Sequence, residues 1–364
     1  MKKYDAVIAG YTCVDLVPAF KKGEKFNSIT DVFKPGKLIE IDGLDFMLGG
    51  IVANTGLAMK KFGKKVFLNG LVGDDFMGII VKESLKKCEV LDGLATTNQA
   101  STAFGIVLAP AGIDRFFLES PGCNQIFDIE HINFDAVAQS RLFHFGYPPL
   151  LERFYLNEGT LLAEMFDKVQ KLGVLTSLDF SLPDSESESG KVNWLAVMQK
   201  VLPFTDIFVP SIEEAMQILM PAKYAEIQSI ENYKFPLEVI KEVGRKAVEL
   251  GAKIVLIKAG EQGAYLTTGD GASLNNSNCV YLSKNWCDCD IWCDAFLADE
   301  TRIINANGAG DTAIAAFLTA ILNGEEPANA LKYATIAGRN NLYCHDIYSE
   351  IADWSDMTKE ILEK

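Results

Sequence analysis

The 364-residue chain is poor in the residues on which several protein classes depend. It has three histidines, at positions 131, 144 and 345, so neither a histidine-based triad nor a histidine metal site is expected. Basic residues are outnumbered and the formal net charge is −15, which argues against a nucleic-acid partner, because phosphate backbones require concentrated Lys and Arg. No apolar run approaches the ~18 residues of a membrane span, so a membrane partner is not expected either.

The first 20 residues, MKKYDAVIAGYTCVDLVPAF, imitate a secretory signal only briefly. Two aspartates interrupt the apolar run and no A-x-A site follows, so Ala6–Ala9 is predicted to be a buried strand and the protein cytoplasmic. Eight cysteines in such a chain are then expected to be thiols. The cluster CDCDIWC lacks paired C-x₂₋₄-C knuckles, and zinc binding and ordinary thiols both stay open for Cys287, Cys289 and Cys293.

Short apolar runs alternate along the chain with longer amphipathic ones. The expected strands are Ala6–Ala9, Lys65–Gly73, Leu142–Phe145, Val174–Asp179, Ile207–Pro210 and Ile254–Lys258. Helical patterns lie between them, such as Leu161–Gly173 and Phe235–Gly251, and left-handed C-caps are expected at Gly63, Gly173 and Gly251. This alternation predicts βαβ units and a mainly parallel sheet covered by helices.

Two regions depart from this alternation. Residues 12–48 and 98–120 carry alternating segments with little helical signal, which predicts a small antiparallel sheet that acts as a lid. Residues 270–298 are predicted to be an irregular insertion. No linker divides the chain, so we expect residues 1–364 to form one domain.

The segment INANGAGDTAIAAFL places a single carboxylate, Asp311, where a glycine-rich turn becomes a helix expected over Thr312–Leu322. One interpretation is a helix cap. The other is an anion site: such a turn points backbone N–H groups at one spot, and the helix dipole favours negative charge there and keeps Asp311 ionised. No G-x-x-x-x-G-K-[ST] or G-x-S-x-G motif occurs. GAGDTA matches the dinucleotide pattern G-x-G-x-x-A, but no strand with an acidic end follows it as that fingerprint requires.

Three segments, in this order, resemble signatures of the ribokinase-like, or PfkB, carbohydrate kinases. GGIVANTGLAMKKFGKKVFLNGLVGDDFMG is similar to the N-terminal signature, which has a Gly-Gly pair, an Asn and G-x-x-G-D-x-x-G. IVLIKAGEQGAYL is similar to the strand that ends in T-x-G-x-x-G-A, and NANGAGDTAIAAFLTAI to D-T-x-G-A-G-D and its helix. The resemblance implies a three-layer α/β/α fold with a mainly parallel sheet and a small β-sheet lid.

The resemblance also implies a function for each motif. Asp311 would be the base that takes a proton from the substrate hydroxyl as it attacks the γ-phosphate of ATP. The anion hole would be formed by Gly308, Ala309 and Gly310. The sugar hydroxyls would be bound by Asp15, Gly49, Gly50 and Asn54. ATP would contact Lys258, Gly260 and Gly263, and Mg²⁺ would be held through Glu214.

Three departures from the family pattern bear on the function. Ser211 replaces the Asn of N-x-x-E, although Glu214 keeps the acid. Asn305 replaces the first Asp of the C-terminal signature, which leaves dependence on a monovalent cation open. Lys258 replaces the threonine of T-x-G, and both an ATP-phosphate contact and an exposed lysine at a strand end remain open for it.

The leading hypothesis is therefore an ATP- and Mg²⁺-dependent kinase of a sugar or nucleoside, with a homodimer through the lid as an expected assembly. A catalytically weak, sugar-binding regulatory homologue is the alternative, motivated by the three departures. An NAD-dependent dehydrogenase rests only on the incomplete dinucleotide pattern. No residue pattern identifies the sugar.

Overall fold

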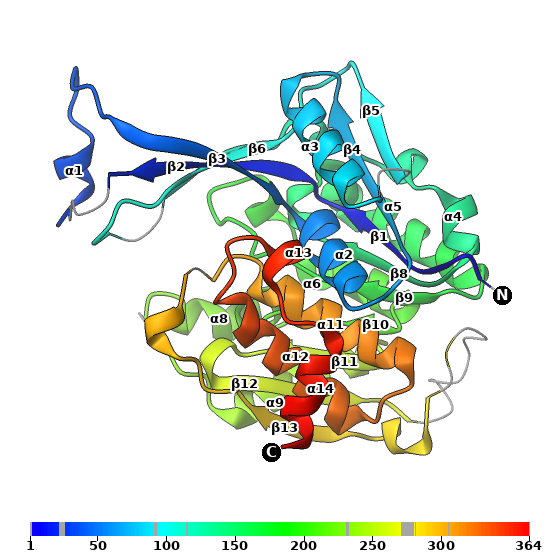
Figure 1. The fold of residues 1–364 in the computed structure, drawn as a ribbon. Helices are drawn as coiled ribbons and strands as arrows, with labels where there is room; N and C mark the ends of the chain where they lie inside the picture. Colours follow the sequence, from blue (N-terminus) through cyan, green and yellow to red (C-terminus); the bar gives the residue numbers. More distant parts are fainter. Residues whose placement is uncertain are drawn as a thin grey trace.

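The computed structural model describes residues 2–21, 26–90, 93–113, 116–230, 233–270, 280, 282–304 and 306–363. Figure 1 shows a body of strands and helices from which a narrow sheet projects. The strands are β1 Tyr4–Gly10, β2 Cys13–Phe20, β3 Ile41–Gly49, β4 Val66–Gly73, β5 Leu94–Thr97, β6 Phe104–Leu108, β7 Phe116–Ser120, β8 Ser140–Gly146, β9 Leu175–Leu178, β10 Ile207–Phe208, β11 Ile254–Lys258, β12 Gly263–Thr268 and β13 Asp290–Asp294. The helices are α1 Ile29–Val32, α2 Ile51–Lys61, α3 Phe76–Lys87, α4 Phe134–Ala138, α5 Glu152–Lys171, α6 Trp194–Val201, α7 Ile212–Leu219, α8 Pro221–Ile227, α9 Leu237–Glu249, α11 Ala309–Asn323, α12 Pro327–Asn341, α13 Ile347–Glu350 and α14 Trp354–Leu362. Within the described residues, no helix is both long and apolar enough to cross a membrane.

The large sheet has nine strands among the described residues, in the order β13-β12-β11-β10-β9-β8-β1-β4-β5. From β5 to β11 all neighbours pair in parallel, which confirms the predicted mainly parallel sheet. β12 and β13 are antiparallel to their neighbours. The prediction that residues 270–298 are irregular is wrong at β13, which forms the edge of the sheet. The short alternation of apolar and polar residues in β13 is hard to recognise in the sequence because cysteines and aspartates surround it.

Both faces of the large sheet are covered by helices, because its strands are apolar on both sides. In β1, Ala6 and Ile8 pack into one hydrophobic cluster with α2, α11 and α12, while Val7 and Ala9 pack into a second cluster with α5, α6 and α9. All four side chains are fully buried. This is the pattern of a parallel strand covered on both faces, and it produces the expected three layers.

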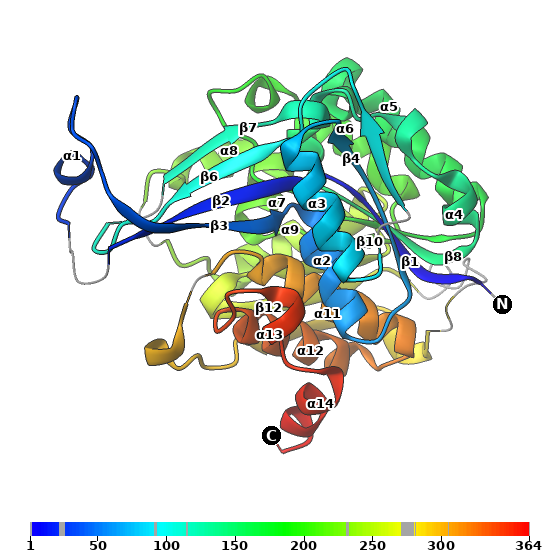
Figure 2. The same ribbon diagram turned by 45° about the horizontal axis from the view of Figure 1, so that its top comes forward.

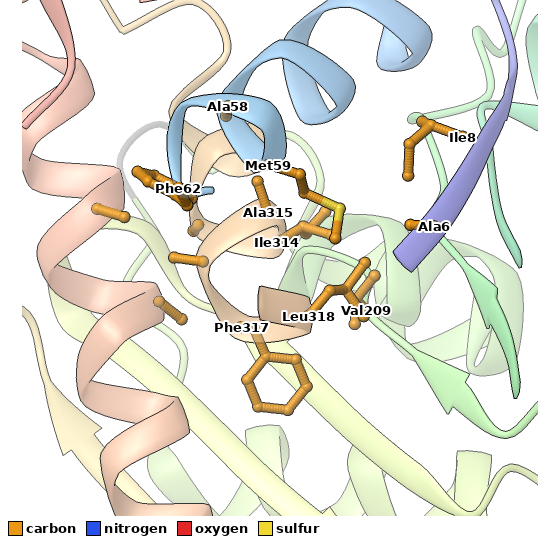
Figure 3. Close-up of a cluster of buried hydrophobic side chains, with 14 of the residues drawn as sticks. Ala6, Ile8, Ala58, Met59, Phe62, Val209, Ile314, Ala315, Phe317 and Leu318 are labelled. Carbon is orange, nitrogen blue, oxygen red and sulfur yellow. The ribbon is translucent and has the colours of Figure 1, made fainter. Parts of the chain in front are cut away.

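Helix α11 lies at the centre of the first cluster and positions the glycine-rich turn. Every residue from Asp311 to Leu322 is buried, which is typical of a helix surrounded by protein on all sides. Figure 3 shows Met59 of α2 beside Ile314 of α11, and Leu318 beside Val209. The turn at the start of α11 therefore rests on a rigid, packed helix.

The expected C-caps at Gly63, Gly173 and Gly251 are confirmed by φ values of 85°, 70° and 118°. The helix predicted over Leu161–Gly173 begins earlier, at Glu152, and is interrupted at residues 156–159 by non-helical backbone. The interruption explains why the helical periodicity became readable only beyond it.

The second sheet has the strand order β3-β2-β6-β7 and is drawn from the two regions predicted to form it. Its β2–β3 and β6–β7 pairs are antiparallel, whereas β2 and β6 are parallel. Figure 2 shows this small sheet extending away from the helices that cover the large one. Where β1 passes into β2, the buried Asn124 side chain donates to the carbonyl of Thr12 at 3.0 Å and accepts from its N–H at 3.3 Å.

Candidate active site

A cavity of about 650 Å³ opens at the carboxyl-terminal edge of the large sheet. Its wall includes Tyr147 directly after β8, Asp179 directly after β9 and Ser211 shortly after β10. Lys258 at the end of β11 and Asp311 in α11 also line it. This edge of an open parallel sheet is where ligands bind, and the volume is that of a small-molecule site.

The glycine-rich turn forms one wall of the cavity. Gly308 is the N-cap of α11 with φ 73° and ψ 3°, and a Cβ there would lie 2.8 Å from Cδ1 of Ile347. The helix begins at Ala309 and not at Thr312 as predicted, so Asp311 lies inside the first turn. The N–H groups of that turn lack intrahelical acceptors and carry the positive end of the dipole, which suits an anion.

The side chain of Asp311 is not a helix cap. Asn54 donates from Nδ2 to Oδ2 at 2.8 Å, and the Tyr147 hydroxyl donates to Oδ1 at 2.7 Å. The residue is 4% exposed, and burial raises the pKa of Asp311 although both hydrogen bonds lower it. Sequence reasoning expects the helix field to keep this carboxylate ionised, and the structure adds a burial that opposes ionisation.

Lys258 is not an exposed lysine at a strand end. Its side chain is 15% exposed, and its Nζ lies 3.0 Å from Oδ1 of Asp179, which is itself buried. Burial lowers the pKa of Lys258, but the neighbouring carboxylates of Asp179, Glu214 and Asp311 outweigh burial and raise it. A Cβ on Gly310 would lie 3.7 Å from this Nζ, so the ammonium faces the glycine-rich turn.

Glu214 lies in the first turn of α7 and forms a capping box with Ser211. Oγ of Ser211 accepts from the Glu214 N–H at 3.2 Å, and Oε2 of Glu214 accepts from the Ser211 N–H at 2.6 Å. Ser211, one of the departures from the family pattern, therefore serves as an N-cap. Across the described residues, no group of three or more His, Cys, Asp or Glu side chains is arranged to hold a metal ion. Metal binding through Glu214 stays a prediction.

Asp15 lies in the small sheet at its junction with the body. Its register partner on β6 is Gly105, whose own partner on β7 is Glu119. A Cβ on Gly49 or on Gly105 would lie 2.8 Å from an Asp15 carboxylate oxygen, so both glycines leave that carboxylate room. Burial raises the pKa of Asp15 to about 6, and Glu119 adds to the effect. The Tyr11 hydroxyl donates to Glu119.

Gly49 and Gly50 join β3 to α2 and bring Asp15 close to the first turn of that helix. Gly50 is the N-cap of α2 with φ 82°, and a Cβ there would lie 2.4 Å from the carbonyl oxygen of Tyr11. Asn54, in the same turn, contacts Asp311. The predicted substrate-binding residues are thus linked through α2 to the predicted base.

The two glycines assigned to ATP have different surroundings. Gly260 lines the cavity with φ 54°, and nothing lies within 4 Å of where its Cβ would be. Gly263 has φ 127°, and a Cβ there would lie 2.1 Å from the carbonyl oxygen of Cys293. The pairing of β12 with β13 therefore accounts for a glycine at position 263.

Three residues of the site were missed by sequence reasoning. Tyr147 lies two residues beyond the predicted strand Leu142–Phe145, and Asp179 is the last residue of the predicted strand Val174–Asp179. The rule that ligands bind at the carboxyl ends of parallel strands could therefore have identified both. Glu119 depends on strand pairing within the small sheet, for which the sequence has no local signal.

Asn305 lies outside the described residues. In the cysteine cluster, Cys287, Cys289 and Cys293 are free, and Sγ of Cys289 lies 2.8 Å from the Asn285 carbonyl oxygen. His144 is buried, its Nδ1 lies 2.9 Å from Oγ of Ser177, and burial lowers its pKa to about 3. These groups show the features of ordinary thiols and a neutral core histidine.

Comparison with known proteins gives one consistent family. The profile of the pfkB family carbohydrate kinases matches residues 9–279. The 5-dehydro-2-deoxygluconokinase of Clostridium perfringens is 24% identical over 354 residues, which cover 96% of this chain and 93% of that protein. The potato (Solanum tuberosum) fructokinase is 30% identical over 112 residues, which cover 30% of this chain and 35% of that protein.

Solved structures of kinases have the same fold as this chain. The ribokinase of Arabidopsis thaliana complexed with ribose and ATP has a TM-score of 0.70 at 19% identity, with 98% of each chain covered. The Xylella fastidiosa fructokinase with bound ATP has a TM-score of 0.71 at 16% identity, with 99% of each chain covered. The family profile ends before the glycine-rich turn, so the placement of Asp311 is carried by the geometry above. With most of its length matched by the profile, the chain belongs to the pfkB family of carbohydrate kinases.

Proposed function

We propose that the protein transfers the γ-phosphate of ATP to a hydroxyl of a sugar or nucleoside, with Asp311 as the catalytic base. The observation that carries this proposal is the position of Asp311. Its buried carboxylate lies in the first turn of α11, at the wall of the cavity that also holds Lys258. Through Asn54 it also adjoins the glycine-rich segment beside Asp15. A base in this place can reach both a phosphate and a sugar.

The residues present fit ATP. The cavity volume of about 650 Å³ accommodates a nucleotide, and Gly260 leaves open space at its wall. Lys258 faces the glycine-rich turn, so its ammonium and the N–H group of Gly310 would bind phosphate oxygens. The N–H group of Ala309 would join them on leaving the Ala306 carbonyl, to which it donates at 3.3 Å. These groups would also stabilise the negative charge of the transferring phosphoryl group.

The chemistry asked of the protein is then mostly positioning and electrostatic stabilisation. The substrate hydroxyl gives its proton to Asp311 as its oxygen bonds to the γ-phosphorus. The bond from that phosphorus to the bridging oxygen breaks, and ADP leaves.

Mg²⁺ would be held through Glu214, since hard carboxylate oxygens suit it and it usually takes only one or two carboxylates together with substrate phosphates. Glu214 lines the same cavity as Lys258 and Asp311, which places its carboxylate on the side where the phosphates would bind. Gly263 near the nucleotide stays a prediction, and dependence on a monovalent cation stays open because Asn305 replaces the aspartate of the family pattern.

The sugar would bind between Asp15 and Asn54, over Gly49 and Gly50. Neighbouring strands of a sheet lie about 4.8 Å apart, so Asp15 and Glu119, two strands apart on the same face, are separated by about 10 Å at the backbone. Because Gly105 has no side chain, the Asp15 carboxylate can lie over β6 on the side towards Glu119. Carboxylates at such spacing can accept hydrogen bonds from several hydroxyl groups of one polyol.

The small sheet would close over the sugar as a lid and exclude water.

The small sheet would also join two copies of the chain, because apolar side chains on β3 and β7 are exposed: Phe46 by 49%, Phe117 by 59% and Leu118 by 55%. Sedimentation equilibrium tests the homodimer, which Phe117→Asp with Leu118→Asp should convert to monomer.

The proposed function is tested by ADP release with Mg-ATP against a panel of neutral sugars, sugar acids, sugar phosphates and nucleosides. Asp311→Asn should lower kcat on the accepted substrate by at least about a hundredfold. Asp356→Asn, which changes an exposed aspartate of α14, is the matched control and should keep full turnover. Normal turnover in Asp311→Asn would exclude Asp311 as the base. Binding of ATP and a sugar without turnover would favour the regulatory homologue.

A further inference from the structure

Tyr147 occupies an unusual place in the backbone. It follows Gly146 at the end of β8 and has φ 64° and ψ 45°, a left-handed conformation that is uncommon for an aromatic residue. The local sequence does not impose it. Pro148 favours extended backbone for the residue before it, so the left-handed conformation of Tyr147 is held by the surrounding packing, where Gly146 lets β8 approach α2 and a Cβ would lie 2.5 Å from Cγ1 of Ile51. Such strain is kept where the surrounding structure determines it, and it concentrates at functional sites.

The strained backbone directs the Tyr147 ring to the carboxylate of Asp311. The Tyr147 hydroxyl donates to Oδ1 at 2.7 Å, while Asn54 donates to Oδ2 at 2.8 Å. Each carboxylate oxygen is therefore fixed by a donor from a different element, one from the end of β8 and one from α2. The carboxyl plane cannot rotate without breaking one of these bonds, and each oxygen keeps a further lone pair for an incoming hydroxyl.

We propose that Tyr147 is a positioning residue, whose hydroxyl holds the carboxylate of Asp311 in the orientation that proton removal from the substrate requires. This inference rests on the proposed function, in which Asp311 is the base. A donor to the ionised form also lowers the pKa of Asp311, against the burial that raises it. The other charged groups around this carboxylate are Lys258 at the end of β11, Asp179 after β9 and Glu214 in α7.

Tyr147→Phe tests the inference, because it removes the hydroxyl and keeps the ring. We expect kcat to fall by about tenfold to a hundredfold, less than in Asp311→Asn, with the KM for the sugar changed less than threefold or so. Since ionised Asp311 is the active form and loses a stabilising donor, the acidic limb of the kcat–pH profile should move to higher pH by about one unit. Tyr155→Phe, which removes the hydroxyl of a partly exposed tyrosine in α5, should leave kcat and the kcat–pH profile unchanged.

The double variant Tyr147→Phe with Asp311→Asn separates positioning from a structural effect. If the hydroxyl acts through the carboxylate, the double variant should be no slower than Asp311→Asn alone. A further loss on that background, or a wild-type pH profile in Tyr147→Phe, would overturn the inference. So would an unchanged kcat with a lower KM, because the hydroxyl would then merely occupy the place of the substrate hydroxyl. Failure of the proposed function is distinct, since Asp311→Asn itself would then turn over normally.

Discussion

Replacing Lys258 by methionine should impair both stability and ATP use, and the structure allows the two effects to be separated. Lys258 and Asp179 form a buried ion pair at 3.0 Å, with side chains 15% and 2% exposed. Methionine keeps most of the apolar volume of the lysine stem but removes the charge. Asp179 is then left buried without its partner.

The expected stability loss follows from that geometry. At 3.0 Å the attraction of the pair is about 5.5 kcal/mol for an effective dielectric constant of about 20, and removal of one partner of a buried pair costs about 3–5 kcal/mol. Lys258→Met should therefore lower the free energy of unfolding by about 3–5 kcal/mol. Burial raises the pKa of Asp179 to about 8, so without the lysine this carboxyl is left either charged and unpaired or protonated; Asp179→Asn removes it and should restore most of that loss.

ATP use should not be restored by the second change. If the ammonium binds a phosphate oxygen, its loss removes a charge-assisted contact of about 2 kcal/mol, and the KM for ATP should rise about 30-fold in both the single and the double variant. Asp179→Asn alone should change this KM little. Urea unfolding and initial rates of ADP release against ATP concentration measure the two quantities on the same preparations.

The opposite end of β11 offers a matched control. Lys253 and Asp206 form an ion pair at 2.6 Å with side chains 15% and 6% exposed, and neither residue lines the cavity. Lys253→Met should cost similar stability and leave the KM for ATP unchanged. A wild-type KM for ATP in Lys258→Met with Asp179→Asn would refute the assignment of Lys258 to phosphate and leave it only a structural partner of Asp179.

Two predictions concern the sugar side. Gly105→Ala places a Cβ 2.8 Å from an Asp15 oxygen, so it should raise the KM for the sugar about tenfold or more while the KM for ATP stays constant, as initial-rate kinetics can show; equal changes in both constants would contradict this. The pKa of Asp15 is raised to about 6, so between about pH 4 and pH 6 the folded state holds a proton that the unfolded chain has already lost. The free energy of unfolding should therefore fall as the pH rises from about 4 to about 6. Urea unfolding of Asp15→Asn should show a gain over wild type at pH 7.5 that shrinks towards pH 4; a gain independent of pH would refute it.

Much of the fold could be predicted because the strands of the large sheet are apolar on both faces. Residues such as Ala6 to Ala9 and Ile254 to Ile257 leave few alternatives to a covered parallel strand. The antiparallel edge was missed because β13 carries aspartates and cysteines and is only partly buried. A partly buried edge strand is stabilised mainly by pairing with its neighbour, so its own sequence need not show a clear alternation of apolar and polar residues.

The candidate site could be predicted where the proposed function and the local backbone geometry require the same residue. The turn at Gly308 needs glycine for its left-handed backbone, and that requirement is visible in the sequence. The partners of Lys258 and Asp311 could not be read in this way. Asp179 and Tyr147 are distant in sequence from the groups they contact, and single side chains after strands carry no periodicity.

The amide of Asn124 holds both backbone groups of Thr12, where the first strand leaves the body and enters the small sheet. The start of β2 is therefore fixed to the body of the protein. A strand that is fixed at its base moves by bending along its length and not by rotating about a hinge. Access to the space beside Asp15 would then be set by the stiffness of β2 and β3 and not by a loop hinge, so residues far out along those strands would influence how readily the site opens.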